Sequence, residues 1–148
     1  MARKERNRKN VSETIALIGE GITERTYFRQ LIQIERLHSF KIKPDLPQHP
    51  DISNYEKKIK NYINKDFDKI YCIIDLDNIY KKQSEKEKYK KIKKAYPNII
   101  FIENNPCFEI WFLLHFNFST RDYNSDCKEV IKYLKKKLQI IRKLRDIF

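Results

Sequence analysis

The sequence is poor in residues that break or cross-link regular structure. Its 148 residues include only two glycines, five prolines and three cysteines. So little glycine and proline argues against collagen, loop-built scaffolds and flexible linkers. Aromatic residues make up 13% of the chain, so it is not disordered overall either. We expect one compact domain with an ordinary core.

Long apolar runs are also absent. The longest, residues 110–116, has about seven residues, whereas a membrane-spanning helix needs roughly 18. The basic start of the chain is not followed by the apolar segment of a secretory signal. We therefore expect a soluble cytoplasmic protein that has no membrane partner. Cys72, Cys107 and Cys127 form no Cys-x-x-Cys pair, and we expect three reduced thiols, two of them buried.

The formal net charge of +12 is unevenly distributed. Residues 1–10, 81–94 and 126–146 carry net charges of +4, +6 and +5, so the rest of the chain is net −3. A basic periphery around an acidic interior suits a protein that binds a phosphate-rich polymer outside and cations inside. A solvated helix face, or an AT-biased coding sequence, gives similar lysine runs. Charge alone leaves both interpretations open.

Apolar periodicity predicts alternating strands and helices. Continuous runs predict buried strands at 14–18, 70–74 and 99–102, and Phe40 and Ile42 predict an exposed or edge strand that ends before Pro44. Helices are predicted at 23–37, 51–64, 81–96, from 106 to about 116, and at 130–141, the first of them capped by Thr23. Residues 1–12 are predicted to be a basic flexible arm.

This order is typical of an α/β fold with three layers. We expect a central, mainly parallel sheet of about four strands flanked by helices, in a single domain over residues 13–148. Ligands of such folds bind beyond the carboxyl ends of the strands. The chemistry is therefore expected at that edge of the sheet.

Acidic residues follow the predicted buried strands at this edge. Glu20 comes directly after the first strand, and Asp75 and Asp77 come directly after the second. In extended backbone, side chains two residues apart point the same way, so Asp75 and Asp77 can share one hard cation. Glu103 and Glu109 lie near the same edge. Together these acids predict a metal site.

Three of the acids also have a structural explanation. Glu24 can complement the positive end of its helix, Glu103 can be a solvated strand end, and Asp77 can start a turn.

Three segments resemble motifs of known families. Residues 15–24, Ile-Ala-Leu-Ile-Gly-Glu-Gly-Ile-Thr-Glu, resemble the Glu-Gly-x-Thr-Glu motif that opens Toprim domains of the overcoming-lysogenization-defect (OLD) nuclease type. Residues 72–77, Cys-Ile-Ile-Asp-Leu-Asp, resemble the Asp-x-Asp motif that closes their central strand. Residues 105–116, Asn-Pro-Cys-Phe-Glu-Ile-Trp-Phe-Leu-Leu-His-Phe, resemble the Asn-Pro-x-Phe-Glu-x-Trp-hydrophobic-His-Phe segment of RloB-like proteins, which are associated with restriction and abortive infection.

The resemblance covers about residues 13–118 and implies a Toprim-like domain whose acids hold one or two Mg²⁺ ions for phosphodiester chemistry. The positions that match the family's metal-binding acids are Glu20, Glu24, Asp75, Asp77 and Glu109. Related nucleases also place a lysine in their C-terminal part, where this chain has too many to select one. Because the sequence stops within the last predicted helix, a C-terminally truncated domain, a shortened family member and an inactive remnant all stay open.

The third motif also has a structural explanation. Phe108, Trp111, Phe112 and Phe116 recur at helical spacing, which favours core packing over base stacking. For His115, a hydrogen bond in the core is favoured over a general-base role.

Two functions fit these expectations. The leading hypothesis is a Mg²⁺- or Mn²⁺-dependent nuclease in anti-phage defence, in which Glu20, Asp75 and Asp77 are the catalytic, metal-holding residues. Six lysines are expected to contact the backbone of DNA or RNA, namely Lys81, Lys82, Lys86, Lys90, Lys93 and Lys94. The alternative is a catalytically silent Toprim module that binds nucleic acid or docks on a partner defence protein. The sequence does not separate the nuclease from a third possibility, a toxin-like effector controlled by a partner protein. It also does not decide between DNA and RNA, or between oligomeric states.

Overall fold

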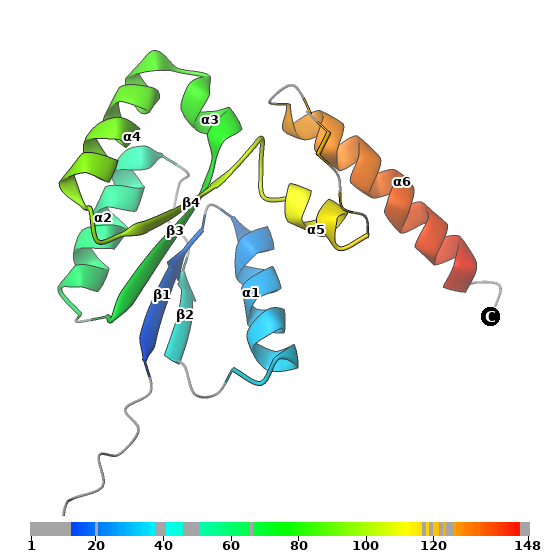
Figure 1. Cartoon of the computed structure of the whole chain (residues 1–148), viewed down its shortest axis with the longest axis horizontal. Helices are drawn as coiled ribbons and strands as arrows, with labels where there is room; N and C mark the ends of the chain where they lie inside the picture. Colours follow the sequence, from blue (N-terminus) through cyan, green and yellow to red (C-terminus); the bar gives the residue numbers. More distant parts are fainter. Residues whose placement is uncertain are drawn as a thin grey trace, which may run out of the picture.

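The computed structural model describes residues 13–19, 21–37, 41–45, 51–65, 67–116, 118, 120–121, 123 and 126–145. Glu20 and the predicted arm of residues 1–12 lie outside this part of the chain. The elements are, in chain order, β1 (Thr14–Ile18), α1 (Ile22–Ile34), β2 (Lys41–Asp45), α2 (Ile52–Ile63), β3 (Lys69–Asp75), α3 (Leu76–Tyr80), α4 (Gln83–Ala95), β4 (Ile100–Asn104), α5 (Ile110–Leu114) and α6 (Cys127–Arg145) (Figure 1).

The strands form one sheet in the order β2-β1-β3-β4, and each neighbouring pair is parallel. Helices cover both faces: α2 and α4 lie on one face and α1 lies on the other (Figure 1). The predicted α/β class and the parallel sheet flanked by helices are therefore confirmed. From β1 the chain winds outward to β2, and from β3 it winds the opposite way to β4. The direction of winding thus reverses between β1 and β3, which is where ligands bind in open α/β sheets.

The main core lies between the sheet and helices α2 and α4. It contains Ile18, Cys72 and Ile74 from one face of the sheet, together with Tyr55 and Ile92 from the two helices. Each aliphatic side chain removed from water in this way contributes about 1.5–3 kcal/mol. The apolar runs of β1 and β3 are continuous because both faces of these strands are covered.

Several boundaries differ from the prediction for local physical reasons. The first helix begins at Ile22, with Gly21 and not Thr23 at the N-cap position. Pro44 lies within β2 instead of ending it, because an edge strand leaves one row of backbone groups without a ladder partner and so needs no N–H there. The predicted helix at 81–96 is α4, and a separate short helix, α3, precedes it.

The C-terminal helix α6 packs against α5 through a second, smaller apolar cluster that includes Leu113, Tyr123 and Val130. A disulfide between Cys107 and Cys127 links the segment before α5 to the first turn of α6. The prediction of three reduced thiols is therefore wrong for this pair, because the chain after α5 folds back and brings together two cysteines separated by 20 positions. The remaining cysteine, Cys72, is free and buried, and burial raises the pKa of its thiol to about 12.

Candidate active site

Asp75 is the last residue of β3, at the carboxyl edge of the sheet beside the point where the winding reverses. Its side chain is buried, and Asn104, its register partner at the end of β4, donates a hydrogen bond of 3.0 Å from Nδ2 to Asp75 Oδ1. Asn104 is itself held by Trp111, whose indole Nε1 donates to Asn104 Oδ1 at 2.7 Å. The chain of contacts from Trp111 through Asn104 fixes the orientation of the Asp75 carboxylate.

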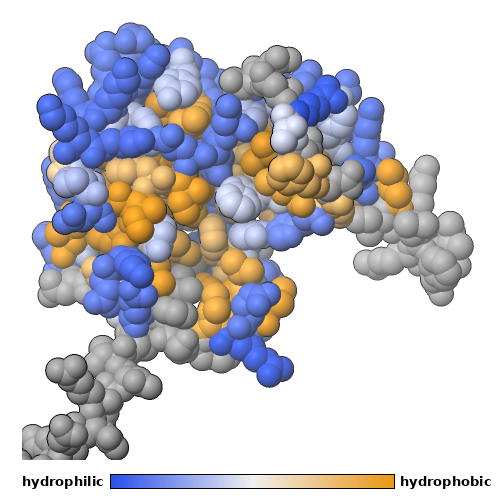
Figure 2. Space-filling model, viewed as in Figure 1, coloured by the Kyte–Doolittle hydropathy of each residue, from blue (hydrophilic) through white to orange (hydrophobic). Residues whose placement is uncertain are grey.

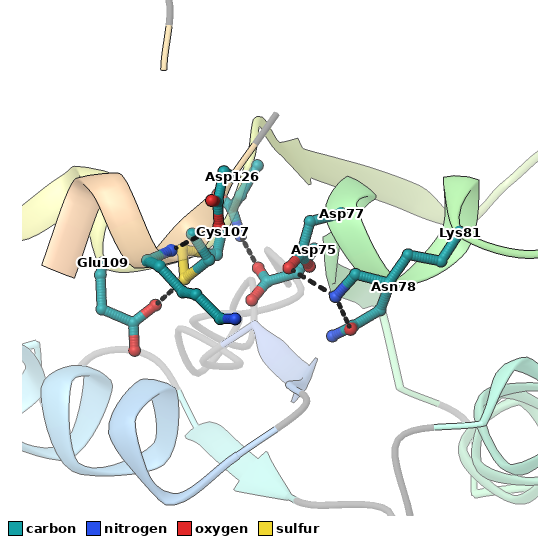
Figure 3. Close-up of a disulfide and its surroundings, with 10 residues drawn as sticks. Asp75, Asp77, Asn78, Lys81, Cys107, Glu109 and Asp126 are labelled. Carbon is teal, nitrogen blue, oxygen red and sulfur yellow. Dashed lines mark hydrogen bonds and ion pairs between the residues drawn. A yellow bond between two sulfur atoms is a disulfide. The ribbon is translucent and has the colours of Figure 1, made fainter. Parts of the chain in front are cut away.

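Asp77 lies in the first turn of α3, not in extended backbone. The prediction that extended geometry aligns the two aspartates is therefore wrong, because the chain turns into a helix directly after Asp75. The helical turn still directs both carboxylates into the same region (Figure 3). The backbone N–H of Asp77 donates to the carbonyl of Pro106 at 3.1 Å, which attaches α3 to the segment that follows β4.

The two oxygens of the Asp77 carboxylate have different surroundings. Oδ2 forms an ion pair with Lys81 Nζ at 3.1 Å, and Lys81 also donates to Asn78 Oδ1 (Figure 3). Oδ1 is buried and has no hydrogen-bond partner. Among the residues that the structure describes, no other buried side-chain oxygen or nitrogen lacks a partner. A buried oxygen without a partner is costly, and a bound cation would satisfy it. The donor set of Asp75 and Asp77 therefore fits a hard cation such as Mg²⁺, which prefers carboxylate oxygens.

Glu24 lies at the start of α1 with its side chain folded over the glycine turn that follows β1. It is buried, and its Oε2 accepts a hydrogen bond of 3.0 Å from the backbone N–H of Gly21. A Cβ at Gly19 would lie 3.0 Å from Glu24 Cβ, and one at Gly21 would lie 3.1 Å from Glu24 Oε2, so a side chain at either position would press on Glu24. The structural explanation for Glu24, at the N-terminal end of its helix, is thus supported. Glu20, which stands between Gly19 and Gly21 in the sequence, lies outside the described residues.

Glu109 lies beside the disulfide, with its Oε2 3.6 Å from Cys127 Sγ (Figure 3). Cys107, Glu109 and Cys127 bring three potential ligand atoms within 4.8 Å of one another, the one such group found among the described residues. In the disulfide, neither sulfur is a thiolate, so this group is not a metal site in the form seen here. The structure does not show Glu109 in contact with the aspartates.

The aromatic residues of the third motif divide into two sets. Phe108 and Phe112 pack against Tyr27 of α1, with ring centroids 5.4 and 5.6 Å away, as core packing predicts. Trp111 is 42% exposed, so the prediction of core packing is wrong for this residue, although its indole N–H is bonded to the buried Asn104.

The fourth aromatic residue of the motif, Phe116, is 36% exposed, so core packing is wrong for it as well, since it follows the last turn of the short helix α5. His115 Nε2 lies 3.0 Å from the Tyr27 hydroxyl. The sequence favours a hydrogen bond of His115 in the core. The structure has the hydrogen bond, but at an exposed position.

Hydrophilic residues gather over α3 and α4 (Figure 2), where the six predicted nucleic-acid-binding lysines lie. Lys82, Lys90 and Lys94 are exposed, and the ammonium of Lys86 lies 5.2 Å from the ring centroid of Tyr80. Lys81 pairs with Asp77, and Lys93 pairs with Glu103.

Glu103 turns its carboxylate toward α4 and not toward the aspartates. Its Oε1 accepts hydrogen bonds from Lys93 Nζ at 2.6 Å and from the hydroxyl of Tyr89. These two bonds lower the pKa of Glu103, and the bond from Lys93 has the larger effect. The pKa of Tyr89 is raised, mainly by burial and next by its bond to Glu103. Glu103 is exposed near the end of β4, as its interpretation as a solvated strand end predicts, and its carboxylate binds residues of α4.

Sequence reasoning missed Asn104 and the role of Trp111. Asn104 is the last residue of β4, as Asp75 is the last residue of β3, but in the sequence it follows Glu103, which comes directly after the apolar run. Asn104 was not selected because the sequence search considered only acidic residues. Trp111 offered no signal, since its hydrogen bond depends on how α5 is placed against the end of β4.

No helix in the described part of the chain has both the length and the apolar character needed to cross a membrane. A family model with the description RloB-like protein matches residues 15–147. No curated protein and no solved structure matches the chain.

Proposed function

This chain belongs to the RloB-like protein family, and we propose that it is a Mg²⁺-dependent nuclease of anti-phage defence with a Toprim-type active site at the carboxyl edge of its sheet. Glu20, Asp75 and Asp77 are the proposed catalytic acids, and Glu24 and Glu109 are proposed to complete the ligand set. The proposed substrate is a DNA or RNA strand, and a partner defence protein in the cytoplasm is proposed to control the activity.

The observation that carries this proposal is the unpartnered Oδ1 of Asp77 beside the buried Asp75. Two neighbouring carboxylates repel each other unless a cation or a proton neutralises them. Their position, at the end of β3 where the winding of the sheet reverses, is also where an α/β fold binds its ligand. A structural pair of acids would be expected to have all its buried oxygens satisfied.

The residues around the acids suit phosphodiester hydrolysis. When bound, Mg²⁺ would lower the pKa of a coordinated water and neutralise charge on the phosphate. Asp75, held by Asn104, keeps one carboxylate in a fixed orientation. Lys81 forms an ion pair with Asp77, and its side chain is 61% exposed. From this position its ammonium can contact a phosphate of the substrate at the edge of the site.

The test is a cleavage assay with labelled single- and double-stranded DNA and RNA, in Mg²⁺, Mn²⁺ or EDTA. Wild-type protein is expected to cleave at least one substrate only with metal, and Asp75→Asn and Asp77→Asn are expected to abolish cleavage. Glu35→Gln is the matched control, because Glu35 is an exposed acid at the end of α1, away from this edge. Cleavage that survives both aspartate substitutions, or no cleavage of any substrate, contradicts the proposal.

Trp111 provides a second readout that does not depend on activity. It is the single tryptophan of the chain and is joined to Asp75 through Asn104. Titration with Mn²⁺, which quenches nearby fluorescence, is expected to lower its emission in wild-type protein and in Glu35→Gln. The same titration is expected to leave the emission of Asp77→Asn unchanged.

The ion pair between Lys81 and Asp77 favours one other function. An ammonium already neutralises part of the acidic pair, as expected of a protein that keeps this scaffold and binds nucleic acid without cleaving it. Absence of both cleavage and Mn²⁺ quenching, together with retained binding of nucleic acid, would favour this silent module.

A further inference from the structure

Next to the acidic edge, the surface of α3, α4 and β4 forms a groove that combines positive charge with an exposed aromatic ring. The groove has a volume of about 470 Å³ and is lined by Lys86, Lys90, Lys93 and Lys94 of α4, with Tyr80 of α3 and Glu103 of β4. We call it the lysine–tyrosine groove.

The charge of the groove is positive in spite of Glu103. Lys93 and Tyr89 both bind the Glu103 carboxylate, so the negative charge of Glu103 is balanced by the positive charge of Lys93. Lys86, Lys90 and Lys94 form no ion pair among the residues that the structure describes. They repeat every four residues of α4, so they form one stripe with steps of roughly 6 Å along the helix. Such a stripe is complementary to the repeated phosphates of a nucleic-acid strand.

The aromatic side of the groove favours an unpaired base as its partner. Tyr80 is 53% exposed, although a tyrosine at the end of a helix can bury its ring against the core. The only ring contact that the described residues show for it is the ammonium of Lys86 at 5.2 Å. Proteins that bind single-stranded nucleic acid stack its bases on aromatic rings and hold its backbone with positive charge. The bases of a duplex already stack on one another and are not available to such a ring.

The groove and the proposed active site share helix α3. Tyr80 follows Asp77 by one turn of the same helix, and Lys81 is bonded to Asp77. A strand whose phosphate lies at Asp75 and Asp77 would therefore place a neighbouring nucleotide at Tyr80.

We propose that the lysine–tyrosine groove binds single-stranded nucleic acid, with an unpaired base stacked on Tyr80 and phosphates on Lys86, Lys90 and Lys94. This inference rests on the proposed function, because it specifies single-stranded nucleic acid as the substrate class of the proposed nuclease site. The binding itself needs no metal and no cleavage.

The experiment measures binding of the full chain in EDTA by fluorescence anisotropy, with a labelled single-stranded oligonucleotide and a hairpin duplex of the same composition. The single strand is expected to bind more tightly. Tyr80→Leu is expected to weaken single-strand binding by roughly 5- to 150-fold, the range found for losing one stacked base. Tyr80→Phe, which keeps the ring, is expected to bind within about twofold of wild type.

The lysines are tested by salt dependence. The triple variant Lys86→Gln, Lys90→Gln, Lys94→Gln is expected to lower the slope of log K against log salt by about 2, since each lost contact with a single strand removes roughly 0.7. The matched control removes the same charge from exposed lysines of α6, with Lys128→Gln, Lys132→Gln and Lys135→Gln. This control is expected to change the slope by less than half as much.

Several outcomes overturn the inference: equal or tighter binding of the duplex, unchanged binding by Tyr80→Leu, or an equal loss of slope in the α6 control. Failure of the nuclease proposal is a separate result. A protein that never cleaves but binds single strands through Tyr80 supports the groove and contradicts the nuclease. A protein that cleaves with metal but binds equally well without Tyr80 supports the nuclease and contradicts the groove.

Discussion

Replacing Asp75 by asparagine and by alanine separates a metal-binding role from a structural one. Asp75 is 8% exposed and accepts a hydrogen bond from Asn104, which is 3% exposed. In Asp75→Asn, the amide oxygen can accept the same bond, and the repulsion with Asp77 disappears. Without metal, we therefore expect the free energy of unfolding of Asp75→Asn to equal or exceed that of wild type.

Asp75→Ala removes the acceptor and leaves the Asn104 amide buried without it. Such an unsatisfied group costs about 1–3 kcal/mol. For a chain of this size, that cost lowers the Tm by roughly 2–12 °C. Because the two variants both lose the charge, the difference between them reports the hydrogen bonding and packing of the side chain without a contribution from its charge.

Metal gives the second comparison. A cation at 100 times its Kd adds about 2.7 kcal/mol to the free energy of unfolding of a protein that binds it only when folded. We expect wild-type protein and the Glu35→Gln control to show this gain in Mg²⁺ or Mn²⁺, and both Asp75 variants to lose it. Urea unfolding followed by circular dichroism, in EDTA and in each metal, measures all four proteins.

Two results would refute the reasoning. If Asp75→Asn destabilised the metal-free protein by several kcal/mol, as breaking a buried polar network does, Asp75 would be structural. If Asp75→Asn kept the full metal-dependent gain, the cation would bind elsewhere.

Three other expectations follow from particular contacts. Tyr55→Phe removes a buried bond of 3.0 Å from the hydroxyl to the carbonyl of Ile73 and should cost about 1 kcal/mol, measured by urea unfolding. Titration with a thiol reagent at pH 8 should detect no thiol in the native protein, one (Cys72) after unfolding and three after unfolding with reduction; three without reduction would contradict the disulfide. Lys93 and Tyr89 lower the folded pKa of Glu103 below its ordinary value of 4.5, so their contribution to stability is present above that value and is lost as the pH falls through the folded pKa. Glu103→Gln should therefore lose less stability than wild type between pH 7 and pH 3, measured by urea unfolding.

The location of the acidic edge could be predicted because it follows from strand ends alone. Continuous apolar runs identify β1 and β3, because both faces of these strands are covered. The run of β4 also identifies a strand, but the prediction that it is buried is wrong, because β4 is an edge strand whose Ile100 is exposed. Parallel strands bring their carboxyl ends to one edge, so an acid directly after such a run must lie there. Asp75 is where this reasoning placed it.

The conformation of the site could not be predicted from the same pattern. A helix of five residues, such as α3, is too short to show apolar periodicity, so Asp77 was placed in extended backbone. The partner of Asp75 depends on the register that pairs Asp75 with Asn104, and register is set by packing over the whole sheet.

The sequence by itself determined the order of the strands and the longer helices, and the edge of the sheet at which Asp75 lies, because these depend on residue type and local spacing. Only the tertiary structure decided which groups touch. It joined Cys107 to Cys127, bonded the indole N–H of Trp111 to Asn104, and left one oxygen of Asp77 buried without a partner. These features depend on how separate elements pack against one another, which no local pattern specifies.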